Sequence, residues 1–185
     1  MYEAGSTAVT FEPIPRDELN ACLIQWGHRI GEIRRPTRGW SHGLCHDGRL
    51  LAVVSADTLI RERVGGLSRQ DVIELSRLCA AQPDLCRVAL RLWRSFVFPA
   101  ITAARGCRWV VSYQDAVLHS GNLYRFDGWV TIGQSRSGTD SRSGRRGRRK
   151  VIWGWCDDPH IRRDRSIGPS LARGDQRAPR KIGLR

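Results

Sequence analysis

Residues 71–105, DVIELSRLCAAQPDLCRVALRLWRSFVFPAITAAR, decide the fold. The opening run, DVIELSRLCA, combines a β-branched start with the length of a buried strand. Pro83 and Asp84 then form a helix start, after which apolar residues recur at helical spacing until Gly106. Pro99 should kink or divide this helix, because proline has no N–H to donate. The stretch therefore predicts a central strand that leads into a long helix.

A helix and a hairpin are predicted before the central strand. Segment 16–31 repeats apolar residues at helical spacing, with Asp17 as a cap and Gly31 as its end. These apolar residues are Leu19, Leu23, Trp26 and Ile30. The dipeptide Asp47-Gly48 separates the runs SHGLCH and RLLAVVSAD, and this pattern indicates a two-residue hairpin.

Three more strand or helix signals follow the long helix. The run CRWVVSY is rich in valine and aromatic residues, which favours a strand. HSGNLYRFDG predicts a short helix that ends near Gly128, and WVTIG and KVIWGW predict two closing strands. The complete order predicts a single α/β domain with a mixed central sheet flanked by helices.

Two segments lack the pattern of a packed core. SRSGTDSRSGRRGRR, between the closing strands, consists mainly of serine, glycine and arginine, so we expect a mobile loop. After Cys156 the periodicity is lost and arginine, glycine and proline recur. We therefore predict a domain over residues 1–156 and a basic, disordered tail over 157–185.

The charge of the chain favours an anionic partner. Lysine and arginine total 31 against 18 acidic residues, a formal net charge of +13. Such a surplus attracts polyanions, and nucleic acid is the leading partner, although a merely soluble basic protein is the alternative. A membrane surface is not predicted because no basic amphipathic helix is evident.

The sequence contains no signal for a membrane or for a metal. No stretch approaches the roughly 18 apolar residues of a membrane span, and the first residues do not resemble a signal peptide, so we expect a cytoplasmic protein. The six cysteines form no close Cys-x-x-Cys pair, which argues against both a disulfide framework and a zinc site. We expect no metal, and we expect small, buried thiols.

The order of elements resembles the fold of the GCN5-related N-acetyltransferases (GNAT), which are acyl-CoA N-acyltransferases. Four blocks, ELSRLC, CRVALRLW, VVSYQDAVLHSGNLYRFDGW and KVIWGW, are together similar to the Mom group of phage DNA-modification proteins. The resemblance covers residues 38–156 and is strongest over 112–129. It implies a transferase that adds a carbamoylmethyl group to N6 of adenine and so protects phage DNA from restriction in the bacterial host cytoplasm.

Two other functions remain open at this stage. One is an acetyl-CoA-dependent N-acetyltransferase that acts on a protein or a small amine. The other is a basic DNA-binding protein without enzymatic activity. The donor is open as well, since stretch 82–89 has no glycine where acetyltransferases wrap the cofactor pyrophosphate in a glycine-rich loop. Acetyl-CoA and an aminoacyl donor are both candidates.

The resemblance, combined with chemistry, points to five candidate catalytic residues. The lone pair of adenine N6 is delocalised into the ring, so the reaction needs a base and a site that stabilises the acyl oxyanion. His42 resembles a histidine of the family's corresponding strand, and its alternative is a hydrogen-bonded histidine at a sheet end. Asp115 follows a strand end, where it orients a histidine, accepts a proton, or only caps the next helix. Ser112 is a weaker candidate, because a serine at a strand end often satisfies only local backbone.

The other two catalytic candidates are Arg77 and Tyr124. Arg77 lies in an apolar strand and must be paired, either with a phosphate of substrate or donor or with Glu74 or Asp115. Tyr124 stands where the acetyltransferase fold often places the acid that protonates the leaving thiolate. Its alternative role is packing against Trp129.

The remaining candidates concern the donor and the nucleic acid. The resemblance implies oxyanion donors in the backbone of the central strand, and a helix N-terminus can present free N–H groups to phosphate. The donor-binding candidates are Leu78, Cys79, Arg87, Val88 and Ala89. The nucleic-acid candidates are Arg142, Arg145, Arg146, Arg148, Arg149 and Lys150. Trp153 and Trp155 either stack on bases or pack in the sheet, and a target adenine in double-stranded DNA would have to be flipped out.

Overall fold

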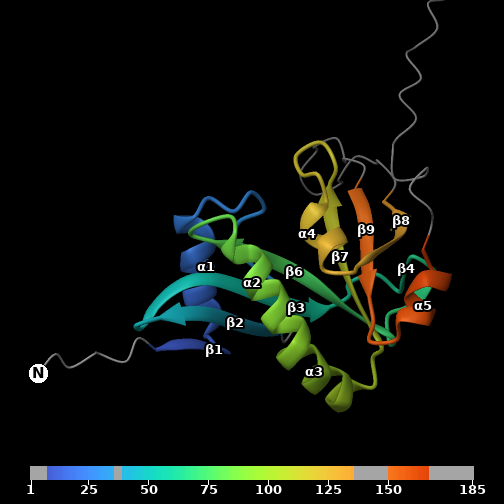
Figure 1. Cartoon of the computed structure of the whole chain (residues 1–185), viewed down its shortest axis with the longest axis horizontal. Coiled ribbons are helices and arrows are strands. Elements are labelled where there is room, and N and C mark those ends of the chain that lie inside the picture. Colours follow the sequence, from blue (N-terminus) through green and yellow to red (C-terminus); the bar gives the residue numbers. More distant parts are fainter. Residues whose placement is uncertain (1–7, 36–38, 136–149, 167–185) are drawn as a thin grey trace, which may run out of the picture.

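The computed structural model describes residues 8–35, 39–135 and 150–166. A seven-stranded sheet runs through the molecule in the order β1-β2-β3-β6-β7-β9-β8 (Figure 1). Its β6–β7 pair is parallel, and the other described pairs are antiparallel. The predicted mixed sheet is therefore confirmed. The strands are β1 (Val9–Pro13), β2 (Gly39–His46), β3 (Arg49–Thr58), β6 (Val72–Ala80), β7 (Trp109–Asp115), β8 (Val130–Gln134) and β9 (Lys150–Trp155), with a separate hairpin of β4 (Arg63–Val64) and β5 (Leu67–Ser68).

Helices cover both faces of the sheet. Along one face lies a long helix formed by α2 (Leu85–Leu92), a π-helical turn η1 (Trp93–Val97) and α3 (Phe98–Arg105), as Figure 1 shows. The other face is covered by α1 (Arg16–Gln25), and by the β4–β5 hairpin together with α5 (Pro159–Asp164). A short helix, α4 (Asn122–Phe126), connects β7 to β8. Among the described residues, no helix is long and apolar enough to cross a membrane.

The hairpin and the strand–helix unit were predicted correctly. Asp47 and Gly48 both have positive φ, 49° and 72°, as a type I′ turn between β2 and β3 requires. The long helix widens into η1 just before Pro99, which lies in the first turn of α3. This division follows from the missing N–H of proline. Gly106, with φ 70°, ends the helix in the left-handed conformation.

The first helix is shorter than its sequence pattern predicts. It ends at Gln25, and Pro15 rather than Asp17 occupies the N-cap position. Gly27 has a φ of 65°, which breaks the helix, and Ile30 is 62% exposed instead of buried. The apolar spacing at Ile30 therefore did not indicate a helix. The residues after Gln25 form a loop that returns toward the sheet.

The prediction of a tail without structure from residue 157 is wrong for residues 157–166. Asp158 accepts hydrogen bonds from the N–H groups of His160 and Ile161 at 2.8 and 3.2 Å, and so caps α5. Pro159 occupies the first turn, where its missing N–H costs nothing. Ile161 packs against a buried cluster under the β4–β5 hairpin. The predictions for 136–149 and 167–185 concern residues outside the described ranges.

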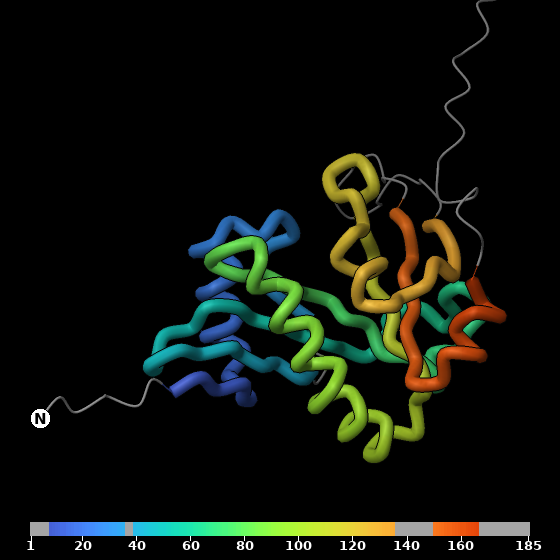
Figure 2. Tube along the Cα trace, viewed as in Figure 1, coloured from blue at the N-terminus to red at the C-terminus, as the bar shows by residue number. Residues whose placement is uncertain are grey.

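Strands β6 and β7 separate after a short contact. Their register joins Val72–Glu74 to residues 109–111, and both strands then continue apart (Figure 2). On its other side, β6 carries a bulge, because Arg77 pairs with Ser55 while Leu75 pairs with the next residue of β3. A bulge bends a strand and increases its twist. We call the divergence of β6 and β7 beyond Glu74 the split.

Candidate functional site

Side chains join β6 and β7 at the vertex of the split, on the face covered by α2. Ser112 follows the last paired residue of β7, and its hydroxyl donates to the carbonyl oxygen of Leu75 on β6 at 3.1 Å. The Tyr124 hydroxyl lies 2.8 Å from the same Ser112 oxygen. Since Ser112 has one hydroxyl proton and a carbonyl only accepts, Tyr124 donates to Ser112. Ser112 and Tyr124, both selected from the sequence, therefore meet at one point.

Tyr124 is held by two tryptophans. Its ring stacks on Trp153 at 5.7 Å between centroids and meets Trp129 edge to face at 5.2 Å. The predicted packing against Trp129 is present, together with a hydroxyl at the split. Burial raises the pKa of Tyr124, and the hydrogen bond with Ser112 offsets only part of this effect. The phenol is therefore protonated at neutral pH and can act as a proton donor.

The loop between β7 and α4 is fixed by Gln114. Its amide donates to the carbonyl of His119 at 2.5 Å and accepts from the indole N–H of Trp153 at 2.5 Å. Gly121 has a φ of 76°, and a Cβ there would lie 2.6 Å from the Gln114 side chain. The glycine is required by this contact within the protein. Gln114 was not predicted, because a glutamine in a strand gives no signal for a role at a loop.

An ion pair lies on the opposite face, where the pairing of β6 and β7 ends. Glu74 is the last residue of β6 paired with β7, and Arg35 donates to its two carboxylate oxygens at 3.1 and 3.2 Å. The Glu74 side chain is only 11% exposed. Burial, followed by the negative charge of Glu74, raises the pKa of the nearby Tyr113 phenol. Glu74 and Arg35 were missed as site residues because they are 39 residues apart in sequence.

Arg77 fixes the loop that carries Arg35. Its guanidinium donates to the carbonyls of Gly31 at 2.9 Å, Glu32 at 3.3 Å and its own neighbour Ser76 at 2.7 Å. These contacts take the place of the predicted ion pair with Glu74 or Asp115, and the predicted phosphate contact stays a prediction. The prediction could not anticipate them because the loop after α1 was expected to be helix.

Two further side chains hold the same loop. Asn20 of α1 accepts from the N–H of Ile33 at 2.8 Å. Arg16 donates to the carbonyl of Arg35 at 2.7 Å and to Asp57 at 3.2 Å. The loop is therefore preorganised by hydrogen bonds from α1 and from β6.

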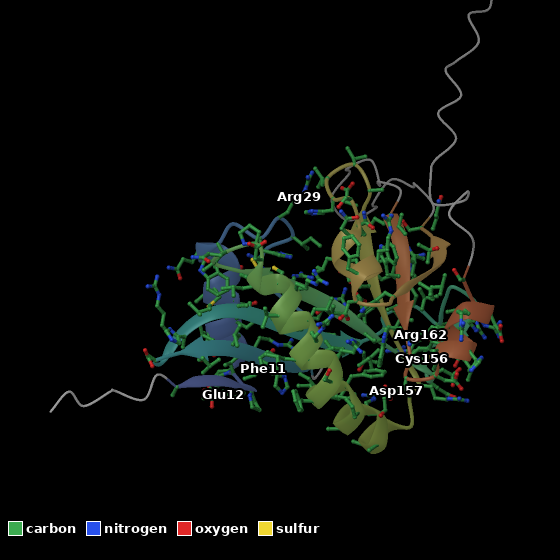
Figure 3. All side chains as sticks on the ribbon, viewed as in Figure 1. Phe11, Glu12, Arg29, Cys156, Asp157 and Arg162 are labelled. Atoms are coloured by element: carbon green, nitrogen blue, oxygen red, sulfur yellow. The ribbon has the colours of Figure 1, made fainter. Side chains whose placement is uncertain are left out.

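A half-buried histidine, His28, lies on this loop. The Nδ1 atom of His28 is buried and has no hydrogen-bond partner among the described residues. Burial lowers the pKa of His28 to about 4, and the charges of Arg77 and His119 act in the same direction. His28 is therefore neutral at pH 7. Arg29 extends from the same loop (Figure 3).

His42 and Asp115 are not brought together. His42 lies on β2, with β3 and β6 between it and the split, and its ring stacks on Phe11 of edge strand β1 at 5.7 Å (Figure 3). Its Nδ1 is buried without a partner among the described residues, and burial lowers its pKa. Asp115 accepts the N–H of Val117 at 3.1 Å and so caps the turn after β7. Asp115 therefore does not cap α4, the role foreseen for it, since that helix begins at Asn122 with Gly121 in the N-cap position and no side-chain cap. No contact couples Asp115 to His42 among the described residues.

The residues predicted to bind the acyl donor differ in whether they are accessible to a ligand. Leu78 and Cys79 lie on β6 beyond its pairing with β7, so their backbone has no β7 partner there. Ala89 is fully buried in the core. The N–H groups that begin α2 are bonded to the carbonyls of the preceding turn at 3.1 to 3.2 Å, so the expected free N–H cradle is absent there. The charges at the start of α2 are those of Asp84, in the N-cap position, and Arg87.

The outer surface of α2 contains a small cavity. Its volume is about 200 Å³, and it is lined by Arg87, Val88, Arg91 and Leu92. Arg87 lies over the ring of Phe126 at 5.7 Å. Arginine and exposed apolar side chains thus lie together one turn beyond the start of α2. The cavity is shallow and separate from the Glu74 side of the split.

The nucleic-acid candidates lie mostly outside the described residues. Only Lys150 is described, at the start of β9, where it pairs with Asp115 of β7. Trp153 and Trp155 are 5% and 3% exposed, so they pack in the core and do not stack on bases. Arg162 of α5 lies 5.0 Å from the centre of the Trp155 ring (Figure 3).

No metal-binding cluster exists among residues 8–35, 39–135 and 150–166. The described cysteines are free thiols, and all except Cys86 are buried.

Comparisons with known proteins match the fold. No protein-family model matches the chain, and no curated protein is significantly similar in sequence. NAA60 of Arabidopsis thaliana, solved with a bisubstrate analogue, superimposes with a TM-score of 0.58 at 13% identity, covering 82% of this chain and all of its own. The aminoglycoside 6'-N-acetyltransferase from Enterococcus faecium gives 0.55 at 10% identity, over 80% of this chain and 96% of its own.

A third solved structure agrees with these two. A probable GNAT-family acetyltransferase from Chromobacterium violaceum gives a TM-score of 0.54 at 14% identity, over 83% of this chain and 90% of its own. At such identities the likeness shows the fold alone, and the predicted GNAT fold is confirmed. The resemblance to the Mom group stays a prediction.

Proposed function

We propose that this protein transfers an acyl group from a thioester to an amine at the split. One observation carries the proposal: β6 and β7 pair over Val72–Glu74 and then diverge, with Tyr124 on one face of the vertex and Glu74 on the other. An acid and a carboxylate on opposite sides of a strand opening suit a reaction in which one partner loses a proton and the other gains one. The GNAT fold supports this proposal by analogy with solved acetyltransferases of the same fold.

The donor suits the side of the split that α2 covers. Peptide groups of Leu78 and Cys79, unpaired toward β7, can bind an extended amide chain as an added strand would, and an N–H there can stabilise the acyl oxygen. The phosphates of a coenzyme A thioester would meet Arg87 and Arg91 instead of a glycine-rich loop. NAA60 has been solved in complex with acetyl-CoA. Acetyl-CoA is therefore the first donor to test, and an aminoacyl thioester the second.

The chemistry uses Tyr124 and Glu74 as opposite partners. The amine nitrogen attacks the acyl carbon, a C–N bond forms and the C–S bond breaks. The departing thiolate takes the phenol proton of Tyr124, and the nitrogen loses its proton to Glu74. Arg35 occupies one lone-pair site on each Glu74 oxygen, so further sites remain to accept that proton.

The acceptor is either a small or protein-borne amine, or an amine of a nucleic acid. The first class follows from the chemistry alone. The second is favoured by the net charge of +13, which attracts polyanions. Adenine N6 in DNA, the acceptor implied by the Mom resemblance, is the most specific form of this second candidate. The carbamoylmethyl group of that family is joined to N6 through a CH2 carbon, so acyl transfer from a glycyl thioester would instead deliver its isomer, a glycyl group. A binding protein without activity is the remaining alternative.

Thiol release tests the proposal. Acetyl-CoA and glycyl-CoA are incubated separately with the full chain and with a polyamine, a peptide with a free N-terminus, or a duplex oligonucleotide. We expect acceptor-dependent release of the thiol and a product heavier by the acyl mass. Glu74→Gln should lower kcat at least a hundredfold, because an amide cannot accept the proton. If neither donor releases thiol with any acceptor, the transferase proposal is wrong.

Nucleoside mass spectrometry separates the two acceptor classes. DNA from cells that express the chain is digested, and modified adenosine is measured. A heavier adenosine that disappears with Glu74→Gln supports the nucleic-acid acceptor. Unmodified nucleosides, together with transfer to peptides or polyamines in vitro, assign the small or protein-borne amine.

A further inference from the structure

Positive charge exceeds negative charge around the vertex of the split on the α1 face. Arg16 is paired with Asp57, and Arg35 with Glu74. Arg77 is buried and has only backbone carbonyls as hydrogen-bond partners among the described residues. Burial lowers the pKa of Arg77, and repulsion from Arg35 adds to this effect. One arginine in this group therefore lacks a carboxylate of its own.

Arg35 has donors left over. A guanidinium carries five N–H groups, and within the described residues Arg35 uses one on each terminal nitrogen, both for Glu74. Its side chain is 27% exposed, whereas that of Glu74 is 11% exposed. Arg35 is therefore the more accessible side chain of this ion pair, and it has donors that Glu74 does not use.

The loop under Arg35 holds these donors in place. Its backbone is bonded to Arg16 at 2.7 Å, and the residues before it are bonded to Asn20 and Arg77. A rigid arginine loses less conformational entropy when it binds an anion than a mobile one does. Hydrogen bonds from three side chains therefore fix the backbone of the loop that carries Arg35. They preorganise a charged group.

We propose that the remaining donors of Arg35 bind an anionic group, a phosphate or a carboxylate, that the acceptor carries near its amine. This inference rests on the proposed acyl transfer and names the substrate class: an amine that bears a nearby anion. An anion bound there shares the guanidinium with Glu74, whose remaining lone-pair sites stay open to the amine proton. Arg35 is thus a specificity-determining residue that acts on the acceptor, and the charge of Arg77 adds to the attraction.

Anion binding to the full chain is the first test. Inorganic phosphate and acetate are titrated separately while the Nε–H signals of the arginines are followed by NMR. We expect a saturable shift of the Arg35 signal, with the stronger response identifying the source of the anion. Arg35→Gln should weaken that binding at least tenfold, and Arg35→Lys, which keeps the charge, by less. Arg34→Gln is the matched control, because this neighbouring side chain is 86% exposed. Equal binding by the wild type and Arg35→Gln overturns the inference.

Matched acceptors give the second test. O-Phosphoethanolamine is compared with ethanolamine, and glycine with glycinamide, in the thiol-release assay. The wild type should favour the anionic member at least tenfold in kcat/KM, mainly through KM, and Arg35→Gln should abolish the preference while Arg34→Gln keeps it. A preference that survives in Arg35→Gln contradicts the inference. Phosphate binding that depends on Arg35, without transfer to any amine, supports the anion site and refutes the acyl transfer.

Discussion

At the scale of single residues, the candidate site consists of one pair that the sequence suggested and one that it did not. Ser112 and Tyr124 were selected separately, and they meet at 2.8 Å because α4 folds back over β7. Glu74 was considered only as a partner for Arg77. A carboxylate in a strand gives no functional signal until the end of strand pairing is known. Arg35 could not be predicted, because the helix was expected to continue to Gly31 and the loop that positions Arg35 therefore could not be foreseen.

Replacing Tyr124 with phenylalanine tests its role as an acid. The ring packing against Trp129 and Trp153 is kept, and Ser112 still donates to Leu75. The free energy of unfolding should therefore fall by only about 1 kcal/mol, the net contribution of one hydrogen bond to stability. We expect kcat to fall about a hundredfold, as for the loss of a general acid. Thermal unfolding and thiol release measure the two effects. An unchanged kcat would remove Tyr124 from the mechanism.

Tyr124 also predicts the alkaline limit of activity. Its phenol acts in the protonated form, and burial raises the pKa of Tyr124 above the ordinary tyrosine value of 10.0. Ionisation of Tyr124 should therefore cause no loss of kcat below about pH 10. A kcat profile from pH 7 to 10.5 checks this expectation. A fall in kcat centred between pH 8 and 9 that is present in the wild type and absent from Tyr124→Phe would contradict this expectation.

His28 predicts a loss of stability in mild acid. Its pKa is about 4 in the folded chain against 6.5 for the free side chain, so the unfolded state binds the proton first as the pH falls. Stability from His28 is therefore complete above pH 6.5 and is lost between 6.5 and 4, by at most about 1.4 kcal/mol per pH unit. Urea unfolding of the wild type and His28→Asn should show a shallower pH dependence in the variant. Parallel curves would show that His28 does not titrate in this way.

At the scale of elements, local signals predicted those structures that local residues determine. The β2–β3 hairpin follows from Asp47-Gly48, and the break of the long helix from Pro99. Strand β1 was missed because it is only five residues long and mostly exposed, although Val9 and Phe11 alternate with polar residues. The end of α1 was misplaced because an apolar residue at helical spacing, Ile30, lies beyond the left-handed Gly27.

The loop after β7 predicts a large effect of one methyl group. Alanine at Gly121 would adopt a φ of 76° and place its Cβ 2.6 Å from Gln114 and 2.8 Å from Trp153. We expect a destabilisation of about 2 to 4 kcal/mol from strain and overpacking together. Gly106→Ala is the control, since its φ is 70° and nothing lies within 4 Å of the added Cβ. It should cost about 1 kcal/mol. Equal losses in chemical denaturation would exclude a steric role for the Gln114 contact.

At the scale of the whole molecule, the sequence predicted the fold but not the site. The order of strands and helices predicted a mixed α/β sheet, since a strand, a long helix and a second strand leave few possible arrangements, and the resemblance of that order to GNAT proteins implied the GNAT fold. The distance between Glu74 and Tyr124 across β6 and β7 depends on where the two strands part. That point is set by packing on both faces, and no single segment encodes it.

The net charge of the molecule predicts salt-sensitive binding to a polyanion. With a charge of +13, the chain should bind a duplex oligonucleotide at 50 mM salt and lose at least tenfold in affinity by 200 mM, because phosphate contacts release counterions. Fluorescence anisotropy measures the slope. Affinity that does not change with salt would argue against phosphate contacts and favour the small or protein-borne amine as acceptor.

The position of a bound donor tests the acyl-transfer account most directly. A crystal structure of the chain with a non-hydrolysable acetyl-CoA analogue should show the acyl group between β6 and β7, beside the backbone of Leu78 and within reach of the Tyr124 hydroxyl. An analogue that binds only at the surface cavity of Arg87 and Arg91, or fails to bind at millimolar concentration, would contradict the account.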